Sequence, residues 1–192
     1  ISSSNAPEIR DRAVFRMAEL NYFEAKFDSA IGTLQRLTAN MGTDFANDAL
    51  QLLYFIQENK TSDPAALREF AGTDLLIRQR KYSEALGRFQ SIVKQYPQAF
   101  LVDDATLKIG DLQVLLRHPQ EALAVLRSVV NDMPGSILRD RAQMKIGEVY
   151  QAVLKDPLRA IEAYELLLTK FPHSLYVEEA RRRIRLLRGD AI

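Results

Sequence analysis

The sequence contains no cysteine and no tryptophan, and only eight glycines and seven prolines occur among its 192 residues. The absence of cysteine excludes disulfides, thiolate zinc sites and a cysteine nucleophile. No apolar run approaches the roughly 20 residues that a membrane-spanning helix needs. Neither sign of charge prevails, because 26 Lys and Arg oppose 25 Asp and Glu for a formal charge of +1. This balance argues against electrostatically driven binding to nucleic acid or membranes.

The residues that are abundant favour helices. Leu and Ala together number 48, whereas Ile and Val together number 22. Leu and Ala are strong helix formers, while β-branched residues favour strands. Hydrophobic residues make up 47% of the chain, which is enough for a folded core. We therefore predict an all-α protein.

A proline-containing segment recurs three times in the second half of the chain. It spans residues 96–105, 133–142 and 171–180, with prolines at Pro97, Pro134 and Pro172. The prolines are almost equally spaced, since the second interval exceeds the first by a single residue. Such a fixed period is the signature of a repeat architecture, in which each helix pair buries its apolar face against its neighbours.

An alanine near the start of each second helix repeats in the same register. Ala85, Ala122 and Ala160 each precede the following proline by the same interval. Ala30 belongs to the same element, but it precedes Ala85 by much more than one repeat period. The array is therefore expected to be irregular at 41–80.

The apolar spacing predicts about ten helices in a single solenoid domain over 1–192. Asp63 and Asp156 are candidate N-caps, and Pro119 and Pro157 suit the first turn of a helix. Residues 44–59 are predicted to form an extra or displaced helix that changes the curvature of the solenoid. Because the chain begins at Ile1 without Met, we expect a fragment or processed product of a longer protein. The predicted helices are 8–24, 27–40, 44–59, 63–79, 82–95, 99–116, 119–132, 137–154, 157–170 and 174–188.

These repeats resemble tetratricopeptide repeats, in which a small residue, an alanine, a large residue and a proline recur at set offsets. One repeat has Gly110, Ala122, Leu126 and Pro134. The next has Gly147, Ala160, Tyr164 and Pro172, with one extra residue in the intervening turn. The small residue permits close helix approach, and the larger one fills the space between the helices. The resemblance implies a right-handed superhelix of antiparallel helix pairs.

The period of these repeats exceeds the roughly 34 residues of an ordinary tetratricopeptide repeat. The long period and the tetrapeptide Phe171-Pro172-His173-Ser174 are similar to a bacterial version of the repeat. That version is common in cell-envelope proteins such as outer-membrane assembly lipoproteins and the Tol-Pal-associated coordinator. The resemblance therefore implies the bacterial periplasm or cell envelope, with the cytoplasm as the alternative.

The search for catalytic chemistry is negative. The two histidines, His118 and His173, are far apart in sequence and both lie beside turn prolines. The acidic pairs at 103–104 and 178–179 fall in predicted first turns, where carboxylates favour the positive end of the helix dipole. We predict no catalytic residues, no metal site and no cofactor, and hence no enzyme.

The basic run 181–188 is interpreted as the outer face of a solenoid cap, with an anionic-ligand patch or the start of another repeat as alternatives. Within it, Glu178 and Arg182, and Glu179 and Arg183, have the i,i+4 spacing of stabilising ion pairs.

In the tetratricopeptide family the first helix of each pair lines a concave groove. The resemblance therefore implies a scaffold that binds a protein or peptide partner there, without nucleic acid and without membrane insertion. The alternatives are an accessory domain of an envelope enzyme, or a spacer or homo-oligomer. For the apolar residues among the groove positions, a place in the core is an equal alternative. The candidate partner-binding residues are Arg12, Phe15, Glu19, Tyr22, Phe23, Phe70, Asp74, Arg78, Asp104, Asp111, Arg141 and Glu148.

Overall fold

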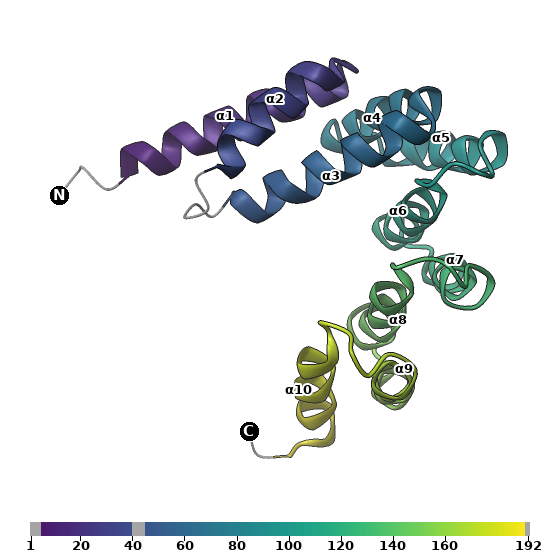
Figure 1. The fold of residues 1–192 in the computed structure, drawn as a ribbon. Coiled ribbons are helices and arrows are strands. Elements are labelled where there is room, and N and C mark those ends of the chain that lie inside the picture. The colour runs from purple at the N-terminus through teal and green to yellow at the C-terminus, as the bar shows by residue number, and fades with distance from the viewer. Residues whose placement is uncertain (1–4, 40–44, 191–192) are drawn as a thin grey trace. The chain divides into compact units, whose positions relative to one another are not determined.

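A computed structural model describes residues 5–39 and 45–190 (Figure 1). The described residues are helical, contain no strand, and are joined by short turns. They divide into two compact units. Unit 1 comprises 1–81 and 94–101, and unit 2 comprises 82–93 and 102–192. The all-α prediction is confirmed, whereas a single domain over 1–192 stays a prediction.

Unit 1 is built from four helices. They are α1 (Asn5–Phe23), α2 (Phe27–Thr38), α3 (Ala46–Ser62) and α4 (Pro64–Arg78). Helix α1 packs against α2 and α4, and α3 packs against the same two helices. The four helices therefore close on one another, and α3 covers a side of α2 and α4 that α1 leaves free.

Aromatic side chains fill the interior of unit 1. The ring centroids of Phe55 and Phe70 are 5.0 Å apart, and those of Tyr22 and Phe55 are 6.4 Å apart in an edge-on arrangement. Tyr22 also lies 6.2 Å from Phe27. Such pairs of rings add to the stabilisation that comes from apolar burial.

The irregular region forms a helix, as the sequence predicts. Helix α3 buries Leu53 and Ile56 and ends at Ser62, three residues beyond the predicted end. Its predicted first residue, at position 44, and the predicted last residue of the preceding helix, at position 40, lie outside the described residues. The change in solenoid curvature stays a prediction.

Unit 2 packs its helices in chain order. They are α5 (Tyr82–Gln95, of which 82–93 belong to this unit), α6 (Val102–Leu115), α7 (Pro119–Asp132), α8 (Arg139–Glu148), η1 (Val149–Val153), α9 (Pro157–Lys170) and α10 (Val177–Arg188). From α6 onward each α-helix packs against the next one in the chain. One continuous core runs through them and is mainly aliphatic, with Leu126, Val129, Ile146 and Leu167 among its buried members.

The repeated glycines mark the closest helix contacts. A Cβ added at Gly147 would overlap the ring of Tyr164, whose Cζ would lie 2.8 Å away. A Cβ at Gly110 would lie 2.9 Å from Cδ2 of Leu126. The pairing of a small residue with a large one, expected from the sequence, is therefore confirmed in both repeats.

The extra residue of the last repeat is taken up inside a helix and not in a loop. Segment η1 is π-helical, and the amide of Leu154 donates to the carbonyl of Val149 at 3.0 Å. A π-turn holds one residue more than an α-turn. The helices on either side therefore keep the pairing seen in the preceding repeat.

The turn between the two helices of a pair contains a left-handed residue that is not glycine. Arg80, Arg117 and Lys155 have φ angles of 59°, 66° and 56°, and they recur with the period of the repeat. Ala25 has φ 56° in the first pair. The same strained backbone conformation thus recurs in each pair, although the residue types at these positions do not indicate it.

The two predicted N-caps, Asp63 and Asp156, are confirmed. The side chain of Asp63 accepts from the amides of Ala65 and Ala66, and Asp156 accepts from the amide of Arg159. Helices α6, α8 and α10 begin two or three residues later than predicted. In the last two cases a turn serine intervenes, because Ser136 and Ser174 each accept a hydrogen bond from the amide two residues on.

Candidate functional site

The first helices of successive pairs in unit 2 are linked by ion pairs. Lys145 on α8 lies 2.6 Å from Asp111 on α6, and Arg183 on α10 lies 3.0 Å from Glu148 on α8. Their side chains are 22–39% exposed, so these four residues form a polar surface that solvent reaches. We call this surface, carried by α6, α8 and α10, the first-helix face.

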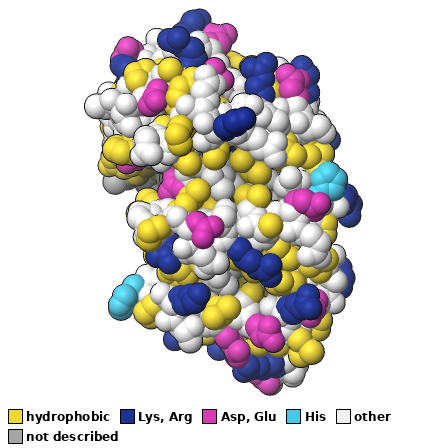
Figure 2. Space-filling model, turned by 90° about the vertical axis from the view of Figure 1, so that its right-hand side faces the viewer, with side chains coloured by type: hydrophobic (Ala, Val, Ile, Leu, Met, Phe, Trp, Pro, Cys, Tyr) yellow, Lys and Arg dark blue, Asp and Glu magenta, His cyan; other side chains and the backbone are white. Residues whose placement is uncertain are grey.

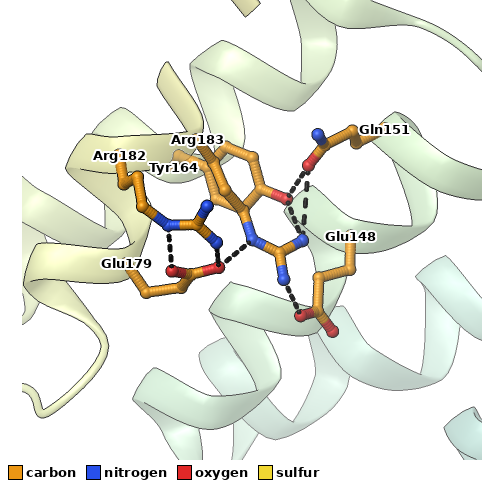
Figure 3. A network of polar contacts seen from close by, with 6 residues as sticks. All are labelled: Glu148, Gln151, Tyr164, Glu179, Arg182 and Arg183. Carbon is orange, nitrogen blue, oxygen red and sulfur yellow. Dashed lines mark hydrogen bonds and ion pairs between the residues drawn. The ribbon is translucent and has the colours of Figure 1, made fainter. Parts of the chain in front are cut away.

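Arg183 is the centre of a polar network on this face (Figure 3). Its guanidinium donates to Glu179 at 2.7 Å and to the Tyr164 hydroxyl at 3.2 Å. The Tyr164 hydroxyl donates to Gln151 at 2.7 Å. Burial raises the pKa of Tyr164, so that hydroxyl remains a donor at neutral pH. The network fixes the Tyr164 ring over Gly147.

Glu179 is held between two arginines. Hydrogen bonds from Arg182 and Arg183 lower the pKa of this carboxyl to about 2. The predicted pair of Glu179 with Arg183 is therefore present. The predicted pair of Glu178 with Arg182 is wrong, because Glu178 instead contacts Arg181 at 2.6 Å, three residues away. Arg182 is better placed for Glu179, to which it donates two hydrogen bonds.

Three of the four aromatic groove candidates of unit 1 lie in its core. Phe15, Tyr22 and Phe70 are 7%, 2% and 2% exposed. This burial favours the core alternative for the three side chains, since each packs between helices. Helix α3 is the physical reason for part of this burial, because its Phe55 contacts both Tyr22 and Phe70.

The polar candidates of unit 1 gather where α1 meets α4. Glu19 is buried and forms ion pairs with Arg16 and Arg78. The Tyr22 hydroxyl donates to Asp74 at 3.2 Å. Arg12 is exposed on α1 and Phe23 is half-buried near its end. The structure thus brings Glu19, Asp74 and Arg78 together, although their contacts join helices to each other.

The remaining candidates of unit 2 are on the first-helix face. Asp104 is half-buried in the first turn of α6, and Arg141 is exposed on α8. Sequence reasoning missed Lys145, although it lies four residues from Arg141 and therefore on the same face of α8. It also did not predict the contact of Arg183 with Glu148, which joins α10 to the preceding repeat.

No group of three or more His, Asp or Glu residues within 5–39 and 45–190 is placed to hold a metal ion. The Nδ1 atom of His118 lies 3.0 Å from the side-chain oxygen of Gln113, at the turn before α7. Among the described helices, none is long and apolar enough to cross a membrane.

A family model supports the repeat assignment over two segments of the chain. The tetratricopeptide repeat family model matches residues 74–99 and 141–174. The crystal structure of the P58(IPK) TPR domain has a TM-score of 0.49 and 15% sequence identity to this chain. That alignment covers 98% of this chain and 47% of the other, so this chain spans about half the length of that structure. No curated protein matches the sequence. The chain carries tetratricopeptide repeats at 74–99 and 141–174.

Proposed function

We propose that this chain is a non-enzymatic scaffold whose first-helix face binds a protein or peptide partner. The observation that carries the proposal is the series of half-exposed charged side chains on α6, α8 and α10. Asp111, Lys145, Glu148 and Arg183 are already positioned by one another, so little side-chain entropy is lost when a partner docks. A bacterial cell-envelope protein is the setting that the long repeat period favours.

Alternating charges suit a partner that carries both signs or many backbone polar groups. Exposed Arg141 and half-buried Asp104 extend the surface beyond the ion pairs. Polar positions of this kind set specificity and orientation, and adjacent apolar groups supply affinity. Half-buried Val114 on α6 offers such a group.

Site-specific photo-cross-linking in cells that express the full-length protein tests the proposal. A benzoylphenylalanine is placed at Arg141, and the control carries it at Gln120, an exposed position on the second helix α7. A defined adduct is expected from position 141 and not from position 120. Adducts at position 120 alone, or equal adducts at both, would contradict binding at the first-helix face.

One observation favours a second candidate, the homo-oligomer. Helix α1 exposes Ile9, Met17 and Leu20 by 65%, 61% and 58%, and their spacing places them on one side of the helix. Self-association through α1 would cover this apolar surface. Light scattering of the wild type against Leu20→Glu tests it, since a concentration-dependent mass lost in the variant supports an oligomer and a constant monomer mass opposes it.

A further inference from the structure

A second surface of unit 2 contains a groove that the first-helix face does not include. It has a volume of about 410 Å³ and is bordered by α7 and α9, the second helices of successive pairs, with α8 and η1 beneath. We call it the α7–α9 groove. Figure 2 views the molecule from the side on which α7 and α9 lie in Figure 1, and hydrophobic side chains there lie between charged ones.

Two cationic side chains converge on one tyrosine in this groove. Arg127 on α7 donates to the hydroxyl of Tyr150 at 2.6 Å. The guanidinium of Arg159 on α9 lies 5.9 Å from the centre of the same ring. Tyr150 belongs to the π-helical segment η1, and π-turns inside helices are frequent at functional sites. The ring is buried, so it acts as a fixed support for both cations.

The positive charge in the groove is incompletely neutralised. The hydroxyl of Tyr150 is the polar partner of Arg127, and Asp156 approaches Arg159 at 3.5 Å. Lys170 lines the far end and makes no ion pair with any described residue. Glu162 is the one acidic side chain among the lining residues, against Arg127, Arg159 and Lys170. The groove therefore attracts negative charge.

The length of the groove and the apolar side chains that line it indicate the size and chemistry of a ligand that would fit. Its lining on α9 runs from Arg159 to Lys170, which is about 16 Å at 1.5 Å per residue. An extended peptide of about five residues spans that length, and a single inorganic anion does not. Between the cationic ends lie apolar side chains, including Ile146, Ala163 and half-exposed Leu166.

We propose that the α7–α9 groove binds an extended acidic peptide segment of a protein partner, with carboxylates on Arg127, Arg159 and Lys170 and an apolar side chain between them. Guanidinium groups recognise carboxylates through paired hydrogen bonds, and an apolar contact adds affinity that charge alone does not give. This site is separate from the first-helix face and does not depend on the function proposed for it.

Fluorescence anisotropy with synthetic peptides tests the proposal on the full chain. The probe is a fluorescein-labelled Glu-Leu-Glu-Leu-Glu peptide, and the matched peptides are Gln-Leu-Gln-Leu-Gln and Glu-Gly-Glu-Gly-Glu. We expect binding of the first peptide that weakens with salt, with at least about tenfold weaker binding of either matched peptide. Equal binding of the glutamine peptide, or no binding of the acidic one, would overturn the proposal.

The double variant Arg127→Gln/Lys170→Gln removes two charges from the groove, and Arg181→Gln/Arg185→Gln removes two exposed charges from α10. The groove variant is expected to lose about tenfold in affinity and the α10 variant less than twofold. Equal losses would show that net charge alone attracts the peptide. Lys170→Gln alone breaks no hydrogen bond or ion pair with a described residue and should weaken binding about threefold while the melting temperature stays constant. Binding unchanged in this variant would also count against the proposal.

Discussion

Unit 1 and unit 2 both bury the apolar faces of their helices, but they differ in how the helices pack and in which side chains lie between them. In unit 1, four helices close on one another around aromatic rings, and Phe55 of α3 contacts both Tyr22 and Phe70. In unit 2, helices follow one another in chain order around an aliphatic core, and ion pairs join successive first helices. Ring contacts around α3 thus distinguish unit 1, whereas the core of unit 2 is mainly aliphatic, with Tyr150 and Tyr164 among its aromatic members.

The largest expected effect tests the aromatic core of unit 1. Phe70 is 2% exposed and is in ring contact with Phe55, so Phe70→Ala should lower the free energy of unfolding by about 3–5 kcal/mol. Tyr54→Ala on α3 is the control, because this side chain is 64% exposed and should change stability by less than about 0.5 kcal/mol. Urea denaturation measures both, and similar values for the two variants would contradict the core assignment.

The second prediction concerns the close helix contacts of unit 2. Gly147→Ala places a methyl group against the ring of Tyr164, which its hydrogen bonds hold in place, and should cost about 2–3 kcal/mol. Gly110→Ala meets only the flexible end of Leu126 and should cost about 1 kcal/mol.

The matched control for both glycines is Gly87→Ala on α5. A Cβ there meets nothing within 4 Å, so the change should stabilise the helix by about 0.5–1 kcal/mol. Thermal unfolding of the three variants should therefore rank them Gly87→Ala, Gly110→Ala and Gly147→Ala, from most to least stable. Any other order would show that close contact between neighbouring helices does not determine the effect of these substitutions on stability.

The third prediction concerns the network on the first-helix face. The pKa of Glu179 is lowered from 4.5 to about 2 by its arginine partners, so its carboxylate stabilises the fold above pH 4.5. That contribution is lost as the pH falls from about 4.5 through about 2, because the unfolded state then binds the proton first. Glu179→Gln should lose less stability than the wild type over this interval. Parallel pH profiles in acid denaturation would contradict the prediction.

The smallest effect is expected at the left-handed turn residues. Arg117 has φ 66°, a conformation that costs an L-residue about 1–2 kcal/mol and glycine almost nothing. Allowing for the greater freedom of glycine in the unfolded chain, Arg117→Gly should stabilise the protein by about 0.5–1 kcal/mol. Gln90→Gly, inside α5, should instead destabilise it by about 1 kcal/mol. Calorimetric melting temperatures that fall in both variants would argue against strain at the turn.

Much of the fold was predictable because its signals are local. Asp63 and Asp156 cap helices through their own side chains, and the spacing of Gly147 and Tyr164 records a contact that recurs in the preceding pair. The strained turn at Arg117 was not predictable, because arginine is also common in helices and its presence does not indicate a left-handed backbone conformation.

The candidate site was harder to predict because surface and core alternate on the same helix. Phe15 and Tyr22 fall at groove positions by register, yet helix packing buries them. An apolar pattern shows that one side of a helix is either buried in the core or contacts a partner. It does not distinguish between these two roles. The α7–α9 groove escaped detection for another reason, since Arg127 and Arg159 meet only through the packing of successive pairs around Tyr150.

The π-turn at η1 has a consequence for how such an array changes length. Because the additional residue is absorbed within 149–153, the insertion shifts neither the N-cap of α9 nor the contact of Tyr164 with Gly147. A gain or loss of one residue is thereby confined to a single turn of backbone. Repeats that differ in length by one residue can then pack against their neighbours in the same way. A change of one residue in repeat length therefore does not require a longer loop.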